Sequence, residues 1–172
     1  MKRIGVISDT HGSRASIDAC IKAAGDVSCW FHLGDYARDS KYLAEKTGLP
    51  VYTVLGNCDG AFYSQATELR FPEPQKLITS EAAVTVENAR IFLCHGHTYD
   101  VDFGGINLSY RAEELNCAAA LYGHTHRSEL SAFGSVLMLN PGSPSRPRGS
   151  RKPSFAVLEI NGSDVNADII TL

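Results

Sequence analysis

Short apolar runs alternate with helical patterns in the first third of this chain, and this alternation restricts its fold more than any other feature. The apolar runs cover residues 3–8, 29–35 and 50–57, and segments with a helical pattern, 13–25 and 39–48, lie between them. Strands that alternate with helices build a parallel sheet, because each helix carries the chain back to begin the next strand in the same direction. We therefore expect an α/β fold.

The pattern changes after residue 65, where apolar segments follow one another with no room for helices between them. We expect antiparallel strands there, over residues 66–71, 75–79, 82–88 and 90–97. One further helix is expected over 106–115. It is followed by strands, expected over residues 118–122, 135–142, 154–160 and 164–171. Both halves fit two sheets packed face to face with helices outside, an α/β architecture that some schemes class as α+β.

The composition suits a single domain over residues 1–172. Of these residues 44% are hydrophobic and 20% are charged, which allows a sizeable core. No repeat or long linker divides the chain, and the Pro/Gly/Ser/Arg-rich segment 140–153 indicates an exposed loop. Five cysteines without a CxxC spacing argue against a disulfide framework and a thiolate zinc site, so reduced and mostly buried thiols are expected.

Charge and hydropathy narrow the classes of partner. The net charge is −3, the pI is about 6.0, and the Lys and Arg residues are scattered, which gives no strong evidence for binding of duplex nucleic acid. The apolar stretch at the N-terminus ends at Ser8, which is too short for a signal peptide. No later stretch approaches the ~18 apolar residues of a membrane span, so we expect a cytoplasmic protein without a membrane segment.

Polar residues that can bind metal follow five of the apolar runs. They are Asp9, His11, Asp35, Asn57, His95, His124 and His126. Taken singly each is weak evidence, since an Asp after a strand often caps a helix and a His pair is often only exposed. Loops at the carboxyl ends of parallel strands share one rim of a sheet, however, so these side chains are expected to converge.

The set contains three oxygen donors and four imidazoles. Such a mixed set suits zinc, manganese, iron or cobalt. Seven ligands are too many for one tetrahedral ion and about right for two ions that share a bridging carboxylate. The spacing of His124 and His126 fits this arrangement, because alternate residues of an extended segment project the same way while Thr125 turns away.

Together these motifs resemble the calcineurin-like metallophosphoesterases. The segments "DTHG", "GD", "GNCD", "HGH" and "GHTH" occur in that order between residues 9 and 126. The short length, the Cys after Asn57 and the segment "NPGSPSRPR" are most similar to the small YfcE-like phosphodiesterase branch. The resemblance implies a four-layer αββα sandwich of two mixed β-sheets flanked by helices. It also implies a metal-dependent phosphodiesterase in which a hydroxide bridging two divalent metals attacks phosphorus in line.

The resemblance also implies a role for each residue of the motifs. One metal would be held by Asp9, His11 and His126, and the other by Asn57, His95 and His124, with Asp35 bridging both. Asp35, Asn57 and His95 would be catalytic. The expected cofactor is two divalent ions per chain, manganese first, with zinc, iron, nickel and cobalt as the other candidates.

Substrate contacts are expected from Asn57, His97 and Arg148. Arg146 stands two residues before Arg148 in the same segment and is a further candidate for contact with a substrate phosphate. His97 is left out of the ligand set, because the family pattern places the metal on the first histidine of "HGH". His32 lies inside an apolar run and is expected to be a hydrogen-bonded core histidine.

The chain departs from the family pattern at Cys58, where many members have a histidine that can protonate the leaving group. A buried thiol is a poor proton donor, so we expect Cys58 to be passive and the metals to stabilise the leaving oxygen.

Three functions remain open. The first is hydrolysis of a small phosphodiester, and the second is hydrolysis of a phosphorylated metabolite as a phosphomonoesterase. The third is a non-catalytic scaffold of the retromer-subunit type, which binds a protein partner. All seven ligand positions are present, which argues against the scaffold. A homo-oligomer is compatible with all three.

Overall fold

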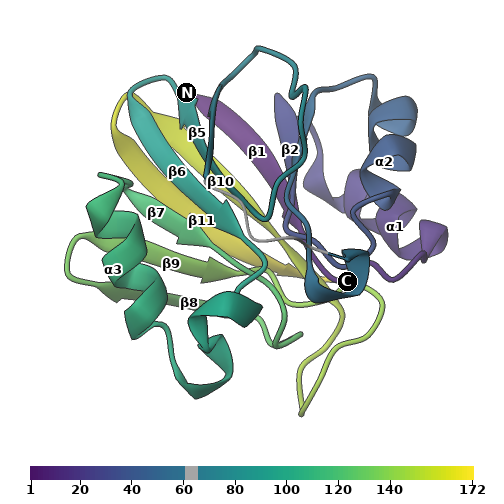
Figure 1. Ribbon diagram of the computed structural model, residues 1–172. Coiled ribbons are helices and arrows are strands. Elements are labelled where there is room, and N and C mark those ends of the chain that lie inside the picture. Colours follow the sequence, from purple (N-terminus) through teal and green to yellow (C-terminus); the bar gives the residue numbers. More distant parts are fainter. Residues whose placement is uncertain (61–65) are drawn as a thin grey trace.

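Two mixed β-sheets face each other in the computed structural model, which describes residues 1–60 and 66–172 (Figure 1). The first sheet has the order β11-β10-β1-β2-β3. Its strands are β1 (Lys2–Ile7), β2 (Cys29–His32), β3 (Val51–Thr53), β10 (Ser154–Asn161) and β11 (Asp164–Thr171). β1, β2 and β3 are parallel to one another, as the alternating pattern predicts, and β10 pairs antiparallel with β1 and β11.

The second sheet has the order β4-β5-β6-β7-β9-β8. Its strands are β4 (Thr67–Arg70), β5 (Glu81–Val86), β6 (Ala89–Cys94), β7 (Ala119–Leu121), β8 (Glu129–Phe133) and β9 (Val136–Asn140). β6, β7 and β9 are parallel, whereas β5 and β8 run antiparallel to their neighbours β6 and β9. The parallel strands of each sheet therefore end at a common edge.

Helices cover both outer faces, so the fold has the four layers that the family resemblance implies (Figure 1). Helices α1 (Arg14–Ala24) and α2 (Asp39–Thr47) pack on the first sheet, and α3 (Ile106–Glu114) packs on the second. Three short 3₁₀ helices complete the described structure: η1 (Asn57–Asp59), η2 (His97–Tyr99) and η3 (Val101–Phe103). No described helix is long and apolar enough to cross a membrane.

Helix α1 shows how the sequence determines these elements. The Ser13 side chain accepts a hydrogen bond from the Ser16 N–H, which caps the first turn. Ile17 and Cys20 lie three residues apart, are fully buried and face the first sheet. Gly25 follows the helix with φ +64°, a conformation that glycine adopts without strain.

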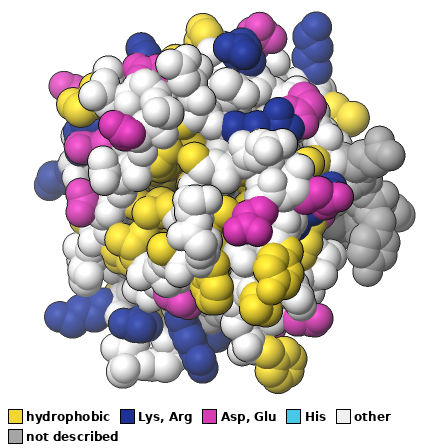
Figure 2. Space-filling model, turned by 90° about the vertical axis from the view of Figure 1, so that its left-hand side faces the viewer, with side chains coloured by type: hydrophobic (Ala, Val, Ile, Leu, Met, Phe, Trp, Pro, Cys, Tyr) yellow, Lys and Arg dark blue, Asp and Glu magenta, His cyan; other side chains and the backbone are white. Residues whose placement is uncertain are grey.

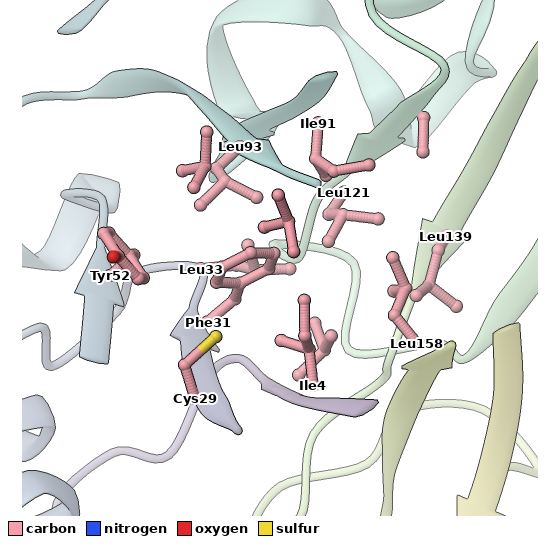
Figure 3. Packing of buried hydrophobic residues seen from close by; sticks show 14 of the residues in the cluster. Ile4, Cys29, Phe31, Leu33, Tyr52, Ile91, Leu93, Leu121, Leu139 and Leu158 are labelled. Atoms are coloured by element: carbon pink, nitrogen blue, oxygen red, sulfur yellow. The ribbon is translucent and has the colours of Figure 1, made fainter. Parts of the chain in front are cut away.

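The main core lies between the two sheets (Figure 3). Ile4, Phe31 and Leu158 from the first sheet face Leu121 and Leu139 from the second, and all are fully buried. Alternate residues of a strand point to opposite faces, so the outward residues of the same strands hold the helices. This packing fixes the relative position of the two sheets, and with it the position of the strand ends.

Two predictions for the segment after residue 65 are wrong. β4 pairs parallel with β5, and residues 75–79 form no strand; within that segment only Thr79 pairs, in an isolated bridge with Val54. The Gln75 side chain instead satisfies the backbone of Thr53, at 2.7 Å to its N–H and 2.8 Å to its carbonyl oxygen. The predicted antiparallel pairing holds for β5 with β6.

Strand β8 was missed by the sequence pattern. It is the edge strand of its sheet, and its residues are exposed or half-buried, so it lacks a hydrophobic alternation. Apolar side chains also reach the surface around α3, where Phe103 and Tyr110 are exposed. Figure 2 shows this side of the molecule, with apolar side chains interspersed among acidic and basic ones.

Candidate metal centre

The predicted ligands follow strands of both sheets. Asp9 comes just after β1 and Asp35 just after β2, and the Asp9 N–H donates to the Gly34 carbonyl, which ties these two ends together. His95 comes directly after β6, and its carbonyl accepts from the Gly123 N–H just after β7. The two edges meet, because His95 Nε2 lies 3.3 Å from Asp35 Oδ1.

Much of the centre has a left-handed backbone. The residues with φ between +47° and +68° include Asp9, His11, Asp35, His124 and His126. Non-glycine residues in this conformation cost about 1–3 kcal/mol each and cluster at functional sites. The predicted extended segment at His124 and His126 is therefore wrong, although Thr125 does turn away and accepts a hydrogen bond from Asn140 Nδ2.

Two glycines of the motifs are required by close approach. A Cβ on Gly56 would lie 2.3 Å from Asp35 Oδ1. A Cβ on Gly123 would lie 1.9 Å from Ser8 Oγ and 2.6 Å from Asp9 Oδ2. Only glycine lets these backbones pass so near the two carboxylates, which explains the Gly of "GN" and of "GHTH".

Four of the predicted ligands form one compact group. The ligand atoms of Asp9, His11, Asp35 and His126 all lie within 4.8 Å of one another. His126 Nε2 is 3.1 Å from Asp9 Oδ1 and 3.3 Å from His11 Nε2. Two atoms that each lie about 2.1 Å from one cation are about 3.0–3.4 Å apart, so these separations suit a shared divalent cation.

The hydrogen bonds that His95 and His126 make through Nδ1 leave the Nε2 atom of each ring free to bind metal. His95 Nδ1 donates to the Leu33 carbonyl at 2.7 Å, and His126 Nδ1 donates to the Arg146 carbonyl at 2.6 Å. A carbonyl only accepts, so each proton sits on Nδ1 and each Nε2 turns a lone pair toward a carboxylate. His95 Nε2 and Asp9 Oδ1 are buried with no hydrogen-bond partner among the described residues. Facing lone pairs of this kind need a cation between them.

The pKa shifts reflect the same need for positive charge. Burial alone would raise the pKa of Asp9, but His126 and His95 bring it below its usual value. Burial would lower the pKa of His126, whereas Asp9 and the Arg146 carbonyl raise it. Both shifts show that the buried Asp9 carboxylate and the His126 imidazole act on each other's pKa across 3.1 Å.

A second group lies beside the first. His124 Nδ1 is 3.1 Å from Asn57 Oδ1, and the rings of His124 and His95 are 5.4 Å apart between centroids. Asp35 faces both groups, with Oδ1 toward His95 at 3.3 Å and Oδ2 toward His11 at 3.9 Å. Its side chain is almost fully buried, and the Cys58 N–H donates to its Oδ1 at 3.0 Å. The structure thus brings all seven predicted residues together, with Asp35 between the two groups.

The other two histidines lie outside these groups. His32 is fully buried, accepts from the Gly34 N–H on Nδ1 and contacts Thr10 Oγ1 through Nε2 at 3.0 Å. Burial lowers the pKa of His32 to about 4. Its burial and ring contacts confirm the hydrogen-bonded core histidine that the sequence predicts. His97 is half-buried, with ring centroids 5.5 Å from His95 and 6.1 Å from His124.

The segment 140–153 is more than an exposed loop. Residues 141–144 are buried, and the hydroxyls of Ser143 and Ser145 both donate to the Asp9 carbonyl. These bonds place the Arg146 carbonyl against His126. Sequence composition indicated only the exposed part of this segment, because hydroxyl contacts with backbone carry no sequence pattern.

A cleft of about 640 Å³ opens beside the first group. Its lining includes His11, Tyr36, Arg38, Leu55, Cys58, Ile78 and Arg146. The Arg38 guanidinium lies 4.6 Å from the centre of the Tyr36 ring. Among the described residues, neither Arg38 nor Arg146 forms an ion pair with a carboxylate, so both can meet an anion. Arg148 is exposed and does not line the cleft, and its substrate contact stays a prediction.

Three residues at this site carry no signal in the sequence. Tyr36 and Arg38 belong to a segment that the helical pattern did not include, and they form the cleft wall. Asp102 accepts a hydrogen bond from His124 Nε2 at 3.0 Å. Its neighbours in "YDVDFGG" match no motif, so only the folded structure reveals this contact.

The chain is similar in sequence to a known protein family and to several of its members. The sequence profile of the calcineurin-like phosphoesterase superfamily domain matches residues 1–163. A probable metallophosphoesterase of Methanothermobacter thermautotrophicus is 34% identical over 173 residues, covering 97% of this chain and 91% of that protein. The phosphodiesterase YfcE of Escherichia coli is 36% identical over 110 residues, covering 63% of this chain and 52% of YfcE.

Solved structures show the same fold. A predicted phosphoesterase from Streptococcus pneumoniae superposes with a TM-score of 0.75 at 32% identity, covering 99% of this chain and 89% of that one. Vps29 of Entamoeba histolytica, complexed with Zn²⁺, superposes with a TM-score of 0.71 at 22% identity, covering 98% of each chain. At this lower identity the likeness to Vps29 concerns the fold alone.

Divalent metal should stabilise the folded protein through Asp9. At a metal concentration 100-fold above Kd, binding should add about 2.7 kcal/mol, or about 5–10 °C in Tm. Asp9→Asn should reduce the shift, because it removes a buried charge that faces His126 and His95. Thermal unfolding of chelator-treated protein with and without Mn²⁺ measures this. Asp164→Asn, the same change at the turn between β10 and β11, should keep the full shift; equal shifts in both variants would contradict the assignment.

Proposed function

Because the chain belongs to the calcineurin-like phosphoesterase superfamily, we propose that it is a metal-dependent phosphodiesterase whose centre holds two divalent cations. The observation that carries the proposal is the position of Asp35. This buried carboxylate turns one oxygen to His95 and the other to His11, and each imidazole belongs to a different group of ligands. A carboxylate between two sets of nitrogen and oxygen donors suits a bridge between two cations.

The proposed ligand sets follow the two groups. One cation would be held by Asp9, His11 and His126. The other would be held by Asn57, His95 and His124. The Asp35 carboxylate would contact both cations. The mixed nitrogen and oxygen donors suit Mn²⁺, and also Zn²⁺, Fe²⁺, Ni²⁺ and Co²⁺. Two bound cations would neutralise the phosphoryl oxygens and lower the pKa of a water molecule at the centre.

The residues of the chain then bind and orient the substrate. Arg146 and Arg38 lie in the cleft, where neither has a carboxylate partner within residues 1–60 and 66–172. A guanidinium binds phosphate oxygens in a bidentate manner. Tyr36, Leu55 and Ile78 offer apolar surface to an ester substituent. A cleft of about 640 Å³ is far larger than a phosphate group and lies within the usual range for small-molecule sites. The size of the cleft therefore favours a diester, which carries a substituent on each side of phosphorus.

Among the described residues, no side chain is evident that could donate a proton to the leaving group. Cys58 is exposed rather than buried. Partial desolvation of its thiol and the nearby Asp35 carboxylate together raise its pKa to about 11, so the thiol keeps its proton at neutral pH. A thiol of such high pKa is a weak acid. Turnover should therefore depend on good leaving groups such as phenolates.

The second candidate is a phosphomonoesterase. Two guanidiniums without carboxylate partners in the described part of the cleft would suit the dianion of a monoester. Hydrolysis of bis(p-nitrophenyl) phosphate and of p-nitrophenyl phosphate separates the two candidates, because both release the same phenolate. Faster turnover of the diester supports the proposal, and faster turnover of the monoester favours the alternative. A scaffold without activity, the third function considered, would hydrolyse neither.

Replacing Asp35 should cost far more activity than replacing His97. Asp35→Asn puts a neutral amide between the two groups, and an amide bridges two cations poorly. His97→Ala removes a ring beside His95 that lies outside both groups, and such losses are typically about 10–100-fold. The measurement is kcat for bis(p-nitrophenyl) phosphate with excess Mn²⁺. Similar losses in the two variants would refute the bridging assignment.

Removing the thiol should change little. Cys58→Ala should keep turnover of the activated diester within a few-fold, because a neutral thiol of raised pKa contributes no acid. A positioned general acid is typically worth about 10²–10⁴-fold in rate. A loss of several hundred-fold at unchanged metal content would show that Cys58 takes part in the reaction.

A further inference from the structure

One proposed ligand is held by a carboxylate that lies outside the metallophosphoesterase motifs. Asp102, in η3, accepts a hydrogen bond from Nε2 of His124 at 3.0 Å. A carboxylate only accepts, so Nε2 carries the proton. Nδ1 is then the free nitrogen of His124, and it lies 3.1 Å from Asn57 Oδ1. The contact with Asp102 thus decides which nitrogen of His124 faces the centre.

The other anchored histidines of the centre are held differently. His95 and His126 donate from Nδ1 to backbone carbonyls and face the centre with Nε2. His124 reverses this orientation, and its anchor is a charged side chain. A carboxylate that accepts from a metal-bound imidazole fixes the ring and raises the basicity of the ligand nitrogen. Among these three anchors, the one on His124 is also the only one that a point mutation can remove.

The position of Asp102 is set by the packing of its own turn. Val101, the residue before it, is buried in the core cluster that covers the second sheet. Its side chain packs against Gly96, where a Cβ would lie 2.9 Å from Val101 Cγ2. The Phe103 N–H donates to the Asp100 carbonyl and closes the turn. The carboxylate is therefore held near His124, while its side chain is 52% exposed and can be changed without opening the core.

We propose that Asp102 is a positioning residue for the cation at His95, Asn57 and His124, an inference that rests on the proposed two-cation centre. Within the described residues Asp102 contacts the centre through His124 alone. Removal of its carboxylate should therefore lower the affinity for one cation and leave the affinity for the cation at Asp9, His11 and His126 unchanged. The cost of losing such a partner is typically about 10–100-fold in metal affinity.

The test is a calorimetric titration of chelator-treated protein with Mn²⁺, which needs no substrate. Asp102→Ala should raise one Kd by about 10–100-fold and leave the other within about two-fold. Asp102→Asn keeps an oxygen that accepts from Nε2 but loses the charge, and should give an intermediate Kd. Asp100→Asn is the matched control, because Asp100 is an exposed aspartate at the start of the same turn with φ +53°, which Asn tolerates. Tm values of the metal-free variants show that each is folded.

The outcomes separate this inference from the proposed function. If folded Asp102→Ala binds both cations with wild-type affinity, the positioning role is overturned and the two-cation centre stays intact. An equal loss of affinity for both cations would also overturn the positioning role, because Asp102 would then act on the whole centre. Wild-type protein that binds fewer than two cations would overturn both the inference and the proposed centre.

Discussion

The centre depends on two buried carboxylates that face imidazole nitrogens. Asp9 and Asp35 are almost fully buried, and the nearest side-chain atoms to their oxygens include Nε2 of His95 and of His126. Each of these rings already donates its Nδ1 proton to a backbone carbonyl, so lone pairs meet at the centre. Buried charge is costly unless it is compensated, and a cation at this point removes the cost.

The two sheets supply different parts of this arrangement. Asp9, Asp35 and Asn57 follow strands of the first sheet, and His95 and His124 follow strands of the second. The apolar layer between the sheets holds these edges together, so the distance from Asp35 to His95 depends on core packing far from the centre. A cation bound here would connect the two sheets, which links metal binding to the stability of the fold.

Short local motifs made the fold class and the convergence of the seven candidate residues predictable. The helix and strand alternation of residues 3–57 appears as parallel strands, and each ligand type follows an apolar run in the sequence itself. The features that sequence reasoning missed are pairings between distant segments and strands without a hydrophobic pattern. β4 pairs parallel with β5 because the chain between them crosses over without a strand, and exposed β8 shows no alternation. Asp102 meets His124 across 22 positions of sequence, a contact that only tertiary structure creates.

The most direct test of the two-cation centre is a crystal structure of the protein soaked with Mn²⁺, with anomalous scattering measured near the manganese edge. The account predicts two strong anomalous peaks per chain on either side of the Asp35 carboxylate. One should lie within bonding distance of Asp9, His11 and His126, and the other within bonding distance of Asn57, His95 and His124. A single peak, or peaks only at the molecular surface away from Asp35, would contradict it.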